Sequence, residues 1–255
     1  MMKNIIVVGN QKGGVGKTTT VLNLATSLSL FRKKVLVVDI DPQGNATTGA
    51  GVDKNNLKYS VYDVLINDVP VSEATVAAKE CGFDLLGANR NLAGAEIELV
   101  DLDNREFRLR NALSKVAANY DVILIDCPPS LSLLTINALS AAKHILVPLQ
   151  CEYYALEGLT DLLNTIARIQ SKLNPELQLL GIIRTMYDKR NNLAQQVSAQ
   201  LVEYFDEKVF YASIPRTVRL AEAPSYGLSA VALDSESVGA QAYIRCAKEL
   251  LNKLK

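Results

Sequence analysis

A chain of 255 residues, 49% of them hydrophobic, is long enough to bury the core of one α/β domain. Its 27 lysines and arginines balance its 27 aspartates and glutamates, so affinity for nucleic acid would have to come from a local basic patch. No run approaches the ~18 consecutive apolar residues of a membrane-spanning helix, which favours a soluble, cytoplasmic protein.

A glycine-rich stretch follows the first predicted strand. The apolar run 5–8 predicts a buried strand, and the sequence KGGVGKTT follows it at 12–19. Glycines in such a loop let successive backbone N–H groups point at a phosphate, while Lys17 supplies an ammonium and Thr18 a hydroxyl for Mg²⁺. Apolar residues at helical spacing predict a helix over 18–31, whose N-terminus adds partial positive charge. This pattern predicts nucleotide binding.

Two further predicted strands end in aspartates. The run 34–39 is continuous and β-branched, and Asp39 and Asp41 lie at its carboxyl end, where ligands bind in open α/β sheets. Because strand residues alternate faces, the two carboxylates point the same way, and both are candidates for a Mg²⁺ shell or for contact with an attacking water. The strand predicted over 121–126 ends in Asp126, as in the second magnesium motif of phosphate-loop NTPases.

The rest of the chain alternates short apolar runs with helical patterns. This alternation predicts a three-layer α/β/α fold with a mostly parallel, twisted sheet of about seven or eight strands, formed by one domain over 1–255. The single histidine, His144, has no nearby acid or serine arrangement, so we expect no catalytic role for it. The remaining strands are predicted over 83–87, 144–149, 177–186 and 209–214, and the remaining helices over 59–66, 91–100, 105–118, 156–173, 193–205 and 237–254.

Five segments together carry a family resemblance. KGGVGKTT, DIDPQGN and LIDCPPS, with TMYDKRNN and IPRTVRLAEAPSYG in the C-terminal third, resemble the ParA/Soj family of chromosome and plasmid partitioning ATPases. The resemblance covers essentially the whole chain and implies a phosphate-loop NTPase of the deviant Walker A class. It also implies that ATP closes a homodimer, that the dimer binds nucleoid DNA, and that a ParB/Spo0J-type centromere-binding partner stimulates hydrolysis and release.

The resemblance assigns roles to individual residues. Gln11 stands where the general phosphate-loop pattern has glycine, and Lys12 matches the signature lysine that reaches the partner's phosphates across the dimer. Such a lysine would act in trans like an arginine finger. The ATP-binding positions implied are Lys12, Gly13, Gly14, Val15, Gly16, Lys17, Thr18 and Thr19, with Pro215 and Thr217 at the adenine end, where many relatives have Asn in place of Thr217. The catalytic positions implied are Lys12, Lys17 and Asp41, and the Mg²⁺ positions Thr18, Asp41 and Asp126.

DNA binding is implied by basic residues in two predicted turns. Relatives bind double-stranded DNA without sequence preference, and the matching positions are Arg190 and Arg219, with Lys189 and Arg216 as neighbours. Such phosphate contacts are salt-sensitive. Many relatives carry a lysine after the glycine of the APSxG turn, whereas Leu228 occupies that position here. The resemblance starts at the first strand, without the helix-turn-helix region of the larger plasmid types, so operator-specific repression is not expected.

Three alternatives share the nucleotide motifs. A MinD-like membrane-positioning ATPase needs an amphipathic C-terminal helix, and the tail 250–255 is too short and too continuous with the last helix, so we expect no stable membrane association. A redox ATPase like the nitrogenase iron protein would use Cys127 or Cys151 to bridge a cluster. A ligase of the dethiobiotin synthetase type would need a small-molecule pocket that the sequence does not reveal. The four cysteines form no CxxC pair, which favours buried free thiols; they are Cys81, Cys127, Cys151 and Cys246.

Overall fold

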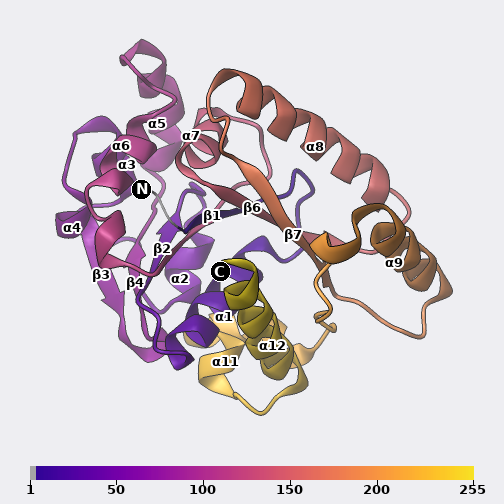
Figure 1. Cartoon of the computed structure of the whole chain (residues 1–255). Coiled ribbons are helices and arrows are strands. Elements are labelled where there is room, and N and C mark those ends of the chain that lie inside the picture. The colour runs from indigo at the N-terminus through magenta and orange to yellow at the C-terminus, as the bar shows by residue number, and fades with distance from the viewer. Residues whose placement is uncertain (1–3) are drawn as a thin grey trace.

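The computed structural model describes residues 4–255, which fold around one sheet of seven strands (Figure 1). The strand order is β3-β4-β2-β5-β1-β6-β7, and every neighbouring pair is parallel except the antiparallel pair β3 and β4. The strands are β1 Ile5–Val8, β2 Val35–Asp39, β3 Thr75–Ala78, β4 Phe83–Leu86, β5 Val122–Asp126, β6 His144–Gln150 and β7 Gln178–Thr185.

Helices cover both faces of the sheet, which makes three layers (Figure 1). Packed on one face are α1, α2, α11 and α12, and on the other α3 and α5 to α9. The helices are α1 Lys17–Leu30, α2 Asn45–Gly49, α3 Val61–Ile66, α4 Val71–Ala74, α5 Leu92–Glu98, α6 Arg108–Ser114, α7 Leu133–Ala141, α8 Ala155–Lys172, α9 Asn192–Phe205, α10 Val218–Glu222, α11 Ala230–Leu233 and α12 Val238–Lys253.

The central strands are apolar throughout because both of their faces are buried. In β1, Ile5 and Val7 face one core, whereas Ile6 and Val8 face the other. The outer helices α8, α9 and α12 are amphipathic, and α8 illustrates the pattern. Its buried residues recur at helical spacing, while the positions between them face solvent; the buried residues are Ala155, Leu159, Leu162, Ile166 and Ile169.

Several segments differ from the sequence predictions. The segment 209–214, predicted as a strand, forms only an isolated bridge between Val209 and Ile182 at the edge of β7. Conversely, β3 and α7 were not predicted. The strand β3 is short and only partly buried, so it lacks the continuous apolar run that marks the central strands.

The sheet brings its functional loops to one edge. Strand β1 lies between β5 and β6, and the register places Asp126 beside both Val8 and Asp39 at the carboxyl ends of three adjacent strands. The chain leaves β1 towards one side of the sheet and later returns to the other side, which is where open α/β sheets form a ligand crevice. The glycine-rich loop and the predicted aspartates therefore meet at this edge.

Candidate active site

The loop between β1 and α1 is shaped by glycines and anchored at both ends. Gly14 and Gly16 adopt the left-handed backbone region, with φ of 74° and 86°, and α1 begins at the next residue. The hydroxyl of Thr185, at the end of β7, donates to the carbonyl of Val15 at 2.8 Å. The side chain of Asn10 accepts from the Lys12 N–H at 2.9 Å. The loop conformation is thus fixed by the fold around it.

The two lysines of this loop occupy different surroundings. Lys17 is buried, and its Nζ donates to the backbone carbonyl of Lys12 at 3.1 Å. Burial lowers the pKa of Lys17, opposed by the nearby carboxylates of Asp126 and Asp41. An ammonium has three protons to donate, and only one meets an acceptor among residues 4–255. The Lys17 ammonium can therefore donate to the phosphate oxygens of a nucleotide bound by its own chain.

Thr18 and Asp126 form the centre of the crevice. The Thr18 hydroxyl donates to Asp126 Oδ2 at 2.7 Å, while Oδ1 of the same buried carboxylate has no partner among residues 4–255. Burial raises the pKa of Asp126 well above its usual range, and the nearby charge of Asp39 adds to the rise. A hydroxyl beside an unpaired carboxylate oxygen fits Mg²⁺, which is held by one or two protein oxygens plus phosphates and waters. Correspondingly, no cluster of three or more His, Cys, Asp or Glu ligands occurs within 4–255.

The two aspartates near the end of β2 have different partners. Asp39 is fully buried, and its Oδ2 accepts from both the N–H and the hydroxyl of Thr47, at 2.8 and 2.7 Å. Its Oδ1 accepts from the N–H of Asp41 at 3.1 Å. Burial raises the pKa of Asp39 to about 6, although these hydrogen bonds lower it. Thr47 and the turn thus donate to both oxygens of Asp39, and its contact with the metal or the water stays a prediction.

Asp41 is the more accessible carboxylate. It is half-buried, and Oδ1 accepts from the Gln43 N–H at 2.9 Å within the turn. Its second oxygen accepts no hydrogen bond from residues 4–255. Asp39 thus serves to position the backbone of Asp41, because the hydrogen bond between them fixes the start of the turn.

A cleft of about 430 Å³ extends from the loop to the predicted adenine end. Gly14, Gly16 and Thr19 line one side, and Pro215 and Thr217 line the other. The Thr217 hydroxyl accepts from the Leu220 N–H at 3.3 Å and so caps α10. The structure therefore brings the phosphate loop and the C-terminal segment together around one cavity.

The four predicted DNA-binding residues lie on two adjacent exposed turns. Lys189 and Arg190 precede α9, and Arg216 and Arg219 lie at the start of α10. A hydrogen bond of 2.9 Å from the Tyr187 N–H to the Ile214 carbonyl holds the two turns side by side.

Both arginines of the predicted pair are bound to carboxylates of the chain itself. Arg190 contacts both oxygens of Asp188, at 3.0 and 2.9 Å, which lowers the pKa of Asp188 to about 2. Arg219 donates to Glu222 at 2.6 Å. Sequence reasoning did not single out these acids, nor Glu152, which pairs with Lys12. Glu152 could have been found from its place just after β6, at the same edge of the sheet.

The structure also bears on the alternatives. All four cysteines are free and buried, so Cys127 and Cys151 do not reach a surface where a second chain could share a cluster. At the C-terminus, Leu250 is buried, and Leu251 and Leu254 pack against the core, so these side chains are not available to a bilayer. Within 4–255, no helix combines the length and apolar character needed to cross a membrane.

Comparison with known proteins identifies the family. A family model described as an AAA domain matches residues 3–179. The sporulation initiation inhibitor protein Soj of Bacillus subtilis is 51% identical over 98% of each chain, and the chromosome partitioning protein ParA of Myxococcus xanthus is 49% identical over 98% of this chain and 88% of its own. A solved structure titled cobyrinic acid a,c-diamide synthase from Mycobacterium smegmatis, with bound ADP and magnesium, superposes with a TM-score of 0.86 at 41% identity, covering 98% and 94% of the two chains. This chain belongs to the ParA/Soj family of chromosome-partitioning ATPases.

Proposed function

We propose that residues 1–255 act as a single ATPase domain, an ATP- and Mg²⁺-dependent switch for DNA partitioning. Two ATP-loaded copies pair, the pair binds double-stranded DNA without sequence preference, and a ParB/Spo0J-type partner stimulates hydrolysis and release. The observation that carries the proposal is that one phosphate loop holds two lysines, Lys17 buried and Lys12 exposed. The partitioning relatives, at 49% and 51% identity, are closer than the protein named for diamide synthesis, at 41%.

Within one chain, the crevice binds and orients the nucleotide. Backbone N–H groups of 13–19 and the Lys17 ammonium receive phosphate oxygens, and Pro215 and Thr217 contact the adenine end across the cleft. Thr18 and Asp126 would hold Mg²⁺, assisted by Asp41, and the ion would neutralise charge on the phosphates.

Hydrolysis needs a positioned water. We assign this role to Asp41, because its second carboxylate oxygen accepts no hydrogen bond from residues 4–255 and its backbone is fixed through Asp39. A carboxylate accepts the water's proton or orients it for attack. The loop 12–19 itself contains no arginine, so we expect slow turnover until a partner completes the site.

Lys12 supplies the contact between copies. The Lys12 side chain is half-exposed, and its ion pair with Glu152 is weak because water screens it. The phosphates of a nucleotide bound by the second subunit can therefore replace Glu152 as the partner of Lys12. A second lysine on the phosphates stabilises the charge that develops during transfer. Stable pairing therefore requires that both copies hold ATP.

DNA binding falls to the two basic turns. All four residues are exposed, and Arg216 lines the nucleotide cleft; they are Lys189, Arg190, Arg216 and Arg219. A dimer presents the set twice to one duplex. The contacts are to phosphates, so affinity falls steeply with salt. We propose accordingly that the protein is cytoplasmic and nucleoid-associated.

DNA retention tests the proposal. Wild type, Arg219→Ala and the control Arg168→Ala, which removes an exposed arginine of α8, are compared with ATP, ADP and no nucleotide at low and high salt. We expect binding with ATP only, loss of most binding at high salt, and weakening by Arg219→Ala but not by Arg168→Ala. Retention that is equal in all nucleotide states and insensitive to salt would contradict the proposal.

A further inference from the structure

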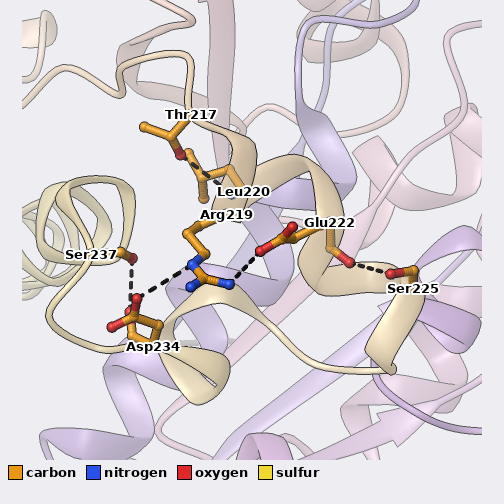
Figure 2. Close-up of polar contacts among 7 residues, drawn as sticks. All are labelled: Thr217, Arg219, Leu220, Glu222, Ser225, Asp234 and Ser237. Carbon is orange, nitrogen blue, oxygen red and sulfur yellow. Dashed lines mark hydrogen bonds and ion pairs between the residues drawn. The ribbon is translucent and has the colours of Figure 1, made fainter.

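The side chain of Arg219 lies between two carboxylates. Its Nη1 donates to Glu222 Oε1 at 2.6 Å within α10, and its Nε lies 3.6 Å from Asp234 Oδ2. Figure 2 shows the guanidinium pointing away from α10 towards Asp234, which directly follows α11, with Glu222 beside it. The arginine proposed to contact DNA is therefore engaged by acids of its own chain.

The backbone around the three residues is held by separate hydrogen bonds (Figure 2). Ser225 Oγ donates to the Glu222 carbonyl at 2.6 Å, and Ser237 Oγ donates to the Asp234 carbonyl at 2.8 Å. The carboxylates are thus presented from fixed positions, while the Arg219 side chain stays 55% exposed. An anion arriving from solvent can reach this guanidinium without any rearrangement of the core.

The same pairing occurs at two other cations proposed to act outside the chain, whereas Lys189 and Arg216 form no ion pair within 4–255. Arg190 is bound by Asp188 and Lys12 by Glu152, whereas Lys17, proposed to act in cis, donates to a carbonyl. Exposed ion pairs are weak and screened by salt, so each of them can be exchanged for a phosphate. Each exchange nevertheless costs the energy of the pair that is broken.

We propose that Glu222, assisted by Asp234, competes with DNA phosphate for Arg219 and thereby keeps single chains off DNA. The inference rests on the proposed DNA-binding function and deepens it. Carboxylate and phosphate oxygens accept the same charge-assisted hydrogen bonds from a guanidinium, and the carboxylate is tethered beside it. The competition weakens each contact, and a dimer offsets this loss because it offers two copies of Arg219 to one duplex.

The nucleotide cleft is built on the same short helix. Val218, Leu220 and Ala221 line the cleft, while Arg219 and Glu222 form the ion pair on the same five-residue element. The helix α10 therefore both lines the nucleotide cleft and holds the ion pair between Arg219 and Glu222.

The test measures DNA affinity of Glu222→Gln against a salt series, with ATP, ADP and no nucleotide. Gln is isosteric but uncharged, so we expect binding about two- to fivefold tighter with ATP at low salt, and any weak binding with ADP or without nucleotide to rise in the same direction. Asp234→Asn, which acts over a longer distance, should give a smaller gain in the same direction. The matched control is Glu236→Gln, which removes the same charge from an exposed position that forms no ion pair within 4–255.

A double-mutant cycle separates competition from a general change in charge. The gain from Glu222→Gln should vanish in the Arg219→Ala background, with thermal unfolding confirming that each variant is folded. The inference would be overturned if Glu222→Gln gave no gain in DNA affinity, or if the gain persisted in the Arg219→Ala background. It would also be overturned if Glu236→Gln gave the same gain. If wild type with ATP retains no DNA at low salt, the proposed function itself is contradicted. ATP-dependent binding by wild type with an unchanged Glu222→Gln variant overturns the inference alone.

Discussion

Lys12 Nζ lies 2.5 Å from Glu152 Oε2 and so joins the phosphate loop to the segment that follows β6. Both side chains are about half exposed, 47% and 46%, so water screens the pair, which is worth about 1 kcal/mol or less. Lys17, five residues along, is buried and bound to a backbone carbonyl. One loop thus carries Lys17, which faces the nucleotide of its own chain, and Lys12, whose present partner can be replaced.

Lys12→Ala should leave the fold and ATP binding in cis nearly intact. Losing one screened surface pair should shift the unfolding midpoint by no more than about 3 °C, because about 1 kcal/mol corresponds to that shift in a chain of this size. Lys17→Ala should abolish ATP binding. Thermal unfolding and titration with a fluorescent ATP analogue measure both effects. A Lys12→Ala variant as defective in ATP binding as Lys17→Ala would place Lys12 in the site of its own chain.

Asp126→Asn should stabilise the nucleotide-free protein while removing its response to Mg²⁺. The buried carboxylate has one oxygen without a partner, and an amide removes its charge at nearly the same volume. We expect a gain of about 1–3 kcal/mol without ligand and no additional stabilisation by Mg²⁺ over ATP alone. Thermal unfolding with ATP, with and without Mg²⁺, measures both, and Asp101→Asn is an exposed control. Lower stability of Asp126→Asn without ligand would contradict this account.

Thr47→Val should lower stability and turnover together. The Thr47 hydroxyl donates to Asp39 and accepts from the Ala88 N–H at 2.9 Å, so valine leaves both buried groups short of a partner. We expect a loss of about 1–3 kcal/mol and slower hydrolysis, because Asp39 also fixes the Asp41 backbone. Chemical denaturation and steady-state ATPase assays measure the two effects. Thr48→Val, at the exposed neighbouring position, is the control, and equal effects of both variants would refute the role of this network.

His144 provides a pH test because it is the only histidine in the chain. Burial lowers the pKa of its imidazole below 6.5, and the charges of Lys143 and Lys208 lower it further. Folding therefore favours the neutral ring, so the stability contributed by this group is complete above pH 6.5 and is lost as pH falls through the lowered pKa. A single imidazole resonance followed by NMR gives this value directly. His144→Gln should reduce the loss of stability between pH 7 and 5, and a measured pKa above 6.5 would contradict the prediction.

The central sheet is predictable from sequence because parallel strands buried on both faces form continuous apolar runs. The segment 209–214 looks similar but is not a strand. Its Phe210 and Tyr211 carbonyls accept from the Arg184 guanidinium, at 2.8 and 3.1 Å, and its Tyr211 N–H donates to Glu249, so only the Phe210 and Ile214 N–H groups pair with β7. A side chain contributed by β7 thus decides the conformation of a segment far along the chain, and no local pattern contains that information.

In the candidate site, too, some contacts can be predicted from the sequence and others cannot. That Thr18 and Asp126 come close follows from a general rule, because loops after neighbouring parallel strands share one edge. The partner of Lys12 depends on a tertiary contact, because Glu152 lies 140 residues from Lys12 along the chain. The partner of Arg219 is local, because Glu222 lies three residues along the same helix, and only Asp234 is brought to it by the fold. Asp188 and Glu222, which pair with the predicted DNA-binding arginines, are thus readable from local spacing, whereas Glu152 and Asp234 emerge only from the fold.

The central claim is that ATP makes two copies pair through Lys12. Sedimentation equilibrium of wild type and Lys12→Ala, each with a non-hydrolysable ATP analogue and Mg²⁺ or with ADP and Mg²⁺, measures it most directly. The account predicts dimers for wild type with the analogue only, and monomers for Lys12→Ala with either nucleotide although it still binds the analogue. Dimers of Lys12→Ala as stable as those of wild type, or wild type that stays monomeric with the analogue, would contradict it.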